Sequence, residues 1–147
     1  MRLSTKGRYA ARAMLDLAIH LDEGLVLIKD ISQREEISKR YLEQLFLPLK
    51  AAGLVRAIRG AHGGFTLAKP PSQIKLIEIV QIMEGSTAPV ECVDDAGICL
   101  RSELCVTREV WSEMKKATDK VLESTTLQDL VERQKGEKQA RVGMYQI

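Results

Sequence analysis

Apolar residues recur at three- and four-residue steps along most of the chain, which is the spacing of helices that bury one face. Ser38 begins the third of these runs, where its hydroxyl suits a helix N-cap, and Gly53 follows as a stop. Pro48 lies within that run, so we expect a kink or an irregular last turn there. The predicted helices cover about residues 6–21, 27–34, 38–52, 74–83, 106–124 and 126–133.

Two short segments, residues 54–59 and 65–68, read as β-strands instead. Residues 60–64 between them include three glycines, which permit the positive φ angles of a tight turn. Two short helices followed by such a hairpin are typical of a winged helix-turn-helix. The predicted fold class is therefore mainly α with a small β-hairpin wing, extended by a long dimerisation helix.

The predicted organisation is a winged helix-turn-helix DNA-binding domain over residues 1–84 and a cysteine-bearing loop over 85–105. A dimerisation helix and a short terminal helix are expected over 106–134, and a flexible tail over 135–147. The loop has little periodicity, and a loop of that length calls for an explanation such as a bound metal. The tail lacks a core pattern.

The long helix carries one apolar stripe that can pack on the core or on a second copy of the chain. The stripe follows a core that is already complete, so an interface with a second copy is one of two alternatives that stay open here. The predicted interface residues are Val110, Trp111, Met114, Ala117 and Val121.

Apolar residues make up 45% of the chain and charged residues 29%, which excludes a largely disordered protein. No apolar run approaches the roughly 18 residues that a membrane span needs. The first residues are basic and lack an apolar signal segment, so a cytoplasmic protein with no membrane partner is expected. The net charge of +2 hides a basic first half, which favours a polyanionic partner. No nucleophile–base pair or phosphate-binding glycine loop stands out, so we predict no enzyme.

A winged helix-turn-helix suits duplex DNA, because a helix fits the major groove and an arginine on a hairpin can enter the minor groove. The carboxylate of Glu43 could accept from cytosine N4 or penalise wrong sites by repelling phosphate. The alternative is a charged, solvated face on a small helical domain. The predicted DNA-binding residues are Arg2, Ser38, Lys39, Arg40, Tyr41, Glu43, Gln44, Arg59, Gly60 and His62.

The three cysteines, Cys92, Cys99 and Cys105, are spaced C-x6-C-x5-C. In a reducing compartment they are reduced thiols, metal ligands or redox sensors rather than structural disulfides. Three thiolates on one loop can hold a soft metal centre, although iron–sulfur clusters usually take four protein ligands. The spacing lacks the C-x2-C pairs of most structural zinc sites. Three unrelated thiols are the alternative.

Three stretches occur together in this order: MRLSTKGRYAARAMLDLA, then ISKRYLEQLFLPLKAAGLVRAIRGAHGGFTLAKP, then the cysteine loop followed by TREVW. Over about residues 1–134 the chain resembles the iron–sulfur cluster regulator (IscR-type) family of winged-helix repressors. The resemblance implies a homodimeric bacterial transcription factor with double-stranded operator DNA as its partner. The helix from Ser38 would then read the major groove, and the wing at Arg59 and Gly60 the minor groove.

The resemblance also implies that Cys92, Cys99 and Cys105 hold a [2Fe–2S] cluster. The regulated genes would include the cluster-assembly machinery, whose proteins would be possible cluster donors. The chain departs from the family where the best-known branch has a histidine ligand, because Arg108 stands there. It also has Arg8 where a nitric-oxide-sensing branch has an acidic residue.

The fourth cluster ligand is therefore open. The candidates are nearby carboxylates, an oxygen ligand from a partner chain or an exogenous thiol; the carboxylates are Glu91, Asp94, Asp95 and Glu103. Two other functions also fit the cysteines. One is a cluster-free repressor of the same fold that senses thiol oxidation or serves cysteine metabolism. The other is a small electron carrier or cluster chaperone.

Overall fold

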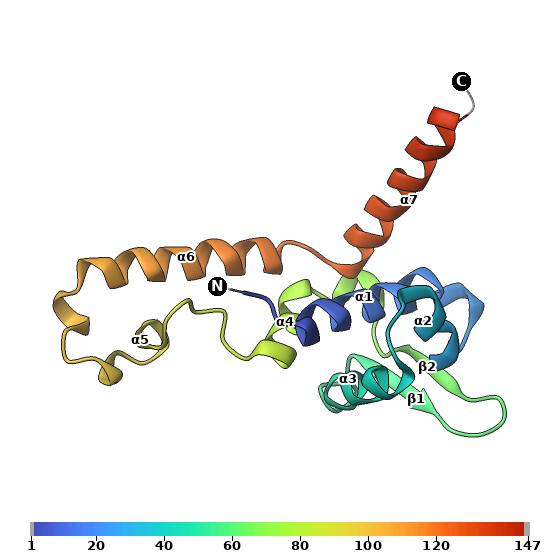
Figure 1. The fold of residues 1–147 in the computed structure, drawn as a ribbon, viewed down its shortest axis with the longest axis horizontal. Helices are drawn as coiled ribbons and strands as arrows, with labels where there is room; N and C mark the ends of the chain where they lie inside the picture. Colours follow the sequence, from blue (N-terminus) through green and yellow to red (C-terminus); the bar gives the residue numbers. More distant parts are fainter. Residues whose placement is uncertain (1, 146–147) are drawn as a thin grey trace.

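The computed structural model describes residues 2–145 and shows a mainly helical chain with one two-stranded hairpin (Figure 1). This confirms the predicted fold class. Single 3₁₀ turns connect several of the elements. The helices and strands are α1 (Thr5–Ile19), α2 (Ile28–Glu35), α3 (Lys39–Ala51), β1 (Val55–Ile58), β2 (Gly64–Leu67), α4 (Leu76–Glu84), α5 (Glu91–Asp94), α6 (Val106–Glu123) and α7 (Leu127–Tyr145).

Helix α1 lies at the centre of the core and contacts α2, α3, α4, α7 and β2. Its apolar face is fully buried because Ala10, Met14 and Leu17 recur at helical spacing. Buried apolar residues of α3 and α4 complete the core around this face. The predicted amphipathic pattern therefore identifies the core side of each of these helices correctly.

The turn between α2 and α3 is fixed by polar contacts that the sequence predicts only in part. Ser38 caps α3 as expected, its hydroxyl accepting a hydrogen bond from the Tyr41 amide at 3.2 Å. Asp16 of α1 is only 2% exposed, and its carboxylate accepts two hydrogen bonds from Arg34 of α2, at 2.7 and 2.8 Å. This bidentate pair locks α2 onto α1 and so sets the position from which α3 starts.

The hairpin pairs β1 and β2 antiparallel, with Val55 opposite Leu67 and Ile58 opposite Gly64. Its turn requires glycine, because Gly60 has a φ of 113° and a Cβ on Gly63 would collide with the carbonyl oxygen of Ile58. On β2, one residue from the turn, Phe65 exchanges two backbone hydrogen bonds of 2.8 Å with Val26. The segment before α2 therefore anchors the wing beside the helix-turn-helix.

After Gly85 the chain leaves the core, and α6 lies alongside this excursion as an arm (Figure 1). The predicted cysteine loop is not wholly irregular, because it contains the short helix α5 and two 3₁₀ turns. These turns are one turn long each, which is too short for helical periodicity to be visible in the sequence. No residue of α6 is fully buried.

The terminal helix is longer than predicted. Helix α7 packs on the core through Leu127 and Val131 and then continues to Tyr145, projecting from the body (Figure 1). The prediction of a short helix followed by a flexible tail from residue 135 is therefore wrong about where the helix ends. The distal part of α7 is exposed on all sides. It is rich in Lys, Glu, Gln, Ala and Arg, which favour a helix even where no face of it is buried. Residues 146–147 of that predicted tail lie outside the described part.

Within residues 2–145, no helix combines the length and the apolar character that crossing a bilayer would require.

Candidate nucleic-acid interface and cysteine loop

Helix α3 presents one polar, solvent-facing side along its whole length. Half of the residues predicted to bind DNA lie here, exposed on consecutive turns beginning at the N-cap: Ser38, Lys39, Arg40, Glu43 and Gln44. Tyr41 differs, because its half-buried ring packs edge-on against Tyr9 at 5.8 Å between centroids. Tyr41 therefore braces α3 against α1 and presents only part of its ring to solvent.

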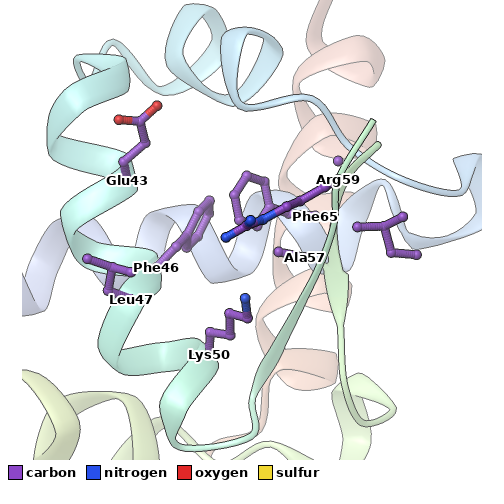
Figure 2. Close-up of a pocket in the computed structure, with 9 residues that line it drawn as sticks. Glu43, Phe46, Leu47, Lys50, Ala57, Arg59 and Phe65 are labelled. Atoms are coloured by element: carbon purple, nitrogen blue, oxygen red, sulfur yellow. The ribbon is translucent and has the colours of Figure 1, made fainter. Parts of the chain in front are cut away.

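A groove of about 400 Å³ separates α3 from the hairpin (Figure 2). Arg59 reaches from the hairpin across this groove toward α3 (Figure 2). Sequence reasoning named Arg59 and Glu43 but missed the other side chains that line the groove, above all Leu47, Lys50 and Ile58. Helical spacing from Glu43 could have found the first two, whereas the place of Ile58 depends on how the hairpin packs on α3.

Gly60 and His62 lie exposed at the hairpin tip, as predicted for a wing. Arg2 lies elsewhere, in a hollow that it shares with Glu84 and the first residues after α4. Next to it, the Ser4 amide and hydroxyl both donate to Glu84. The structure therefore brings residues 2–4 to the base of the cysteine loop and not to the groove beside the hairpin.

The three cysteines are free thiols on three different turns of the loop. Cys92 in α5 and Cys105 at the N-cap of α6 are half-buried, whereas Cys99 is exposed. Hydrogen bonds from the Thr107 hydroxyl, and then from the backbone amide of Arg108, lower the pKa of the Cys105 thiol. Cys105 is thus the thiol of the loop that is favoured as a thiolate, the form that binds metals and reacts with oxidants.

The loop as described does not form a metal site. No three His, Cys, Asp or Glu side chains within residues 2–145 lie close enough together to hold one metal ion. Arg108, at the position where the resemblance implies a histidine ligand, donates instead to the Cys92 carbonyl oxygen at 2.7 Å. The described arrangement therefore shows no ready-made site for a single metal ion, and Arg108 cannot itself serve as a ligand.

The start of the loop is tied to the long helix through Asp119 of α6. Thr87 is buried and donates from its hydroxyl to this carboxylate, and Lys115 donates to it from one turn away at 2.7 Å. Burial acts to raise the pKa of Asp119, but the hydrogen bonds from Lys115 and Thr87 outweigh it and hold the pKa below its ordinary value. The carboxylate is therefore held charged as the link between loop and helix.

The predicted interface stripe of α6 is open to solvent in the single chain. All five predicted residues are exposed: Val110, Trp111, Met114, Ala117 and Val121. The opposite side of α6 faces α4 and α5. The core therefore does not cover this stripe, and its covering by a second copy stays a prediction.

Comparison with known proteins identifies the family that has this architecture. The profile of the Rrf2 family, described as an iron-dependent transcriptional regulator, matches residues 3–133. The regulator CymR of Bacillus subtilis is 42% identical over 95% of this chain and 96% of its own length. The regulator IscR of Photorhabdus laumondii is 41% identical over 91% and 81% respectively.

Two solved structures agree with these matches. The structure of CymR, described as the global cysteine regulator of B. subtilis, superposes with a TM-score of 0.76 at 41% identity, covering 90% of this chain and 98% of that one. The structure of T. potens IscR gives a TM-score of 0.76 at 40% identity, covering 90% and 88%. Regulators named CymR and regulators named IscR are thus similar to this chain at nearly equal identity. The chain belongs to the Rrf2 family and is a winged-helix, DNA-binding transcriptional regulator, not an enzyme.

Proposed function

We propose that this chain is a homodimeric regulator that binds operator DNA through α3 and the hairpin and receives its signal on the cysteine loop. The observation that carries the proposal is the placement of three free thiols on a segment linked to both functional halves. Thr87 joins the loop to α6, and Glu84, just before the loop, is hydrogen-bonded to Ser4 at the start of α1. A change at the thiols can therefore shift both the proposed dimer helix and the DNA-binding domain.

DNA binding follows from the charges beside the groove. Arg40, Lys50 and Arg59 can neutralise phosphates, which supplies most of the affinity. Sequence choice would come from base edges reached by Arg40, Glu43 and Gln44. In a dimer built on the α6 stripe, two copies of α3 would meet successive major grooves about 34 Å apart.

The signal received on the cysteine loop takes one of two forms. In the first, the cysteines bind a [2Fe–2S] cluster and the regulator controls cluster-assembly genes, which the relatives named IscR support. Within residues 2–145 no three potential ligands lie together around one position. What this chain itself supplies is a Cys105 thiol of lowered pKa and a loop that is hydrogen-bonded to α6 through Arg108 and Asp119.

In the second form the thiols act without a metal, which the relatives named CymR support. Peroxide could oxidise two of the three thiols to a disulfide, with loss of two protons and two electrons to the oxidant. The lowered pKa of the Cys105 thiol favours this chemistry, because the thiolate is the attacking species. The three thiols are free in the described loop, so two of them would first have to come within bonding distance.

The test uses protein purified without oxygen. Iron, sulfide and visible absorbance are measured on the wild type and on Cys92→Ala, Cys99→Ala and Cys105→Ala variants. Iron-bound, coloured wild type with colourless variants supports the cluster form. Colourless, iron-free wild type whose operator affinity responds to peroxide supports the second form. If a variant that combines all three cysteine-to-alanine changes responds to iron supply and peroxide as the wild type does, the cysteine loop is not the sensor.

A further inference from the structure

Leu47 is an apolar residue in the middle of the polar face of α3. It is 69% exposed, whereas the other leucines of α3, Leu42, Leu45 and Leu49, are almost completely buried. Its neighbours one turn away on the same face are Glu43 and Lys50, both exposed and charged. The core does not use Leu47, so its exposure needs another explanation.

The groove beside Leu47 is apolar at its floor and charged at its rim. Phe46 and Phe65 form the floor with ring centroids 4.7 Å apart, and this packing keeps the groove open. Ile58, which is 52% exposed, lines it from the hairpin side. Lys50 and Arg59 stand at its edges, with the Arg59 side chain reaching toward α3 (Figure 2). An occupant that combines an apolar group with negative charge nearby therefore suits this lining.

Duplex DNA offers that combination to a helix in the major groove. The C5-methyl group of thymine is the apolar group on the base edges there, and phosphates flank every base. We infer that Leu47 and its side of the groove form a subsite for the methyl group of a thymine in each operator half-site. Lys50 and Arg59 take the adjacent phosphates, and the carboxylate of Glu43 repels phosphate from the position where the base must sit.

The test removes the methyl group alone. A duplex is selected from a randomised library with the full-length protein, and each thymine is replaced in turn by deoxyuridine. At one position per half-site the wild type should lose about fourfold in affinity, the factor for one buried methyl group. The Leu47→Ala variant should bind the thymine and uracil duplexes equally at that position.

The matched control is Val142→Ala, because Val142 is a 54% exposed aliphatic residue on α7, away from the hairpin. This variant should keep the full preference for thymine. Two results would overturn the inference: no thymine whose replacement weakens the wild type, or a Leu47→Ala variant that still distinguishes thymine from uracil. The inference rests on the proposed binding of DNA by α3. Since the readout compares two bases at one position, its failure is distinct from a loss of DNA binding, which would weaken the thymine and uracil duplexes alike.

Discussion

Arg108 donates a hydrogen bond from its Nε to the backbone carbonyl oxygen of Cys92, at 2.7 Å, and so joins the first turn of α6 to α5. A guanidinium has five donors and no acceptor, so this residue serves as a brace and not as a metal ligand. The contact makes the position of the first cysteine depend on α6. Loop rearrangement and movement of α6 are therefore coupled in this chain.

Replacing Arg108 with Ala should loosen the loop. The variant loses one hydrogen bond of about 1 kcal/mol, so amides of residues 91–95 should exchange with deuterium about fivefold faster. Hydrogen exchange with mass spectrometry measures this. Arg101→Ala, which removes an exposed arginine from the same loop, should leave that exchange unchanged. Equal protection in the wild type and the Arg108→Ala variant would mean that the contact does not hold α5.

Replacing Arg59 with Ala should weaken operator binding about tenfold, because the guanidinium that crosses the groove is lost. If Arg59 contacts phosphate, the slope of log affinity against log salt should also fall by about one. Fluorescence anisotropy at several salt concentrations measures both quantities. Arg141→Ala on the exposed distal part of α7 serves as the control, with affinity near that of the wild type. Unchanged affinity and salt dependence for Arg59→Ala would remove the hairpin from the interface.

Charges placed on the exposed stripe of α6 should abolish the proposed dimer. Met114→Glu combined with Val121→Glu should weaken self-association by about 100-fold or more, since each carboxylate would be buried against an apolar surface. Sedimentation equilibrium measures the change. Lys116→Glu, on another face of the same helix, should remain dimeric. A dimer that persists in the double variant would place the interface elsewhere.

The Asp119 link should make stability depend on pH in a defined direction. Because the pKa of the folded carboxyl is lowered, its contribution is present above the unfolded pKa of about 3.9 and is lost as the pH falls through the folded value. Asp119→Asn should therefore lower the free energy of unfolding by about 1 kcal/mol at pH 7. Below about pH 4 the free energies of unfolding of the variant and the wild type should become more alike. Urea unfolding at both pH values tests this. If the difference in free energy of unfolding between the wild type and Asp119→Asn does not change with pH, the charge of the Asp119 carboxylate does not contribute to stability.

Local patterns in the sequence predicted most of the fold. Helical periodicity identified the buried face of α1, and Ser38 was found as the cap of α3 from residue type and position alone. The glycines of residues 60–64 identified the hairpin turn, and Gly60 has the positive φ expected there. These features depend on interactions between residues close in sequence, so they can be predicted from the sequence without the structure.

The distal part of α7 was missed for the opposite reason. The prediction required an apolar stripe, whereas residues 135–145 are helical although every one of them is exposed. The turns of the cysteine loop were missed because each is too short to show a period.

The sequence by itself determined the order of helices and hairpin, the winged-helix class and the presence of three closely spaced thiols. Tertiary structure alone decided that Leu47 and Ile58 share one groove, that Arg108 holds Cys92, and that the cysteines do not converge on a metal site within residues 2–145. The physical reason is that these relationships depend on how separate elements pack. Such packing is set by the summed contacts of the whole core and leaves no mark in the local spacing of residues.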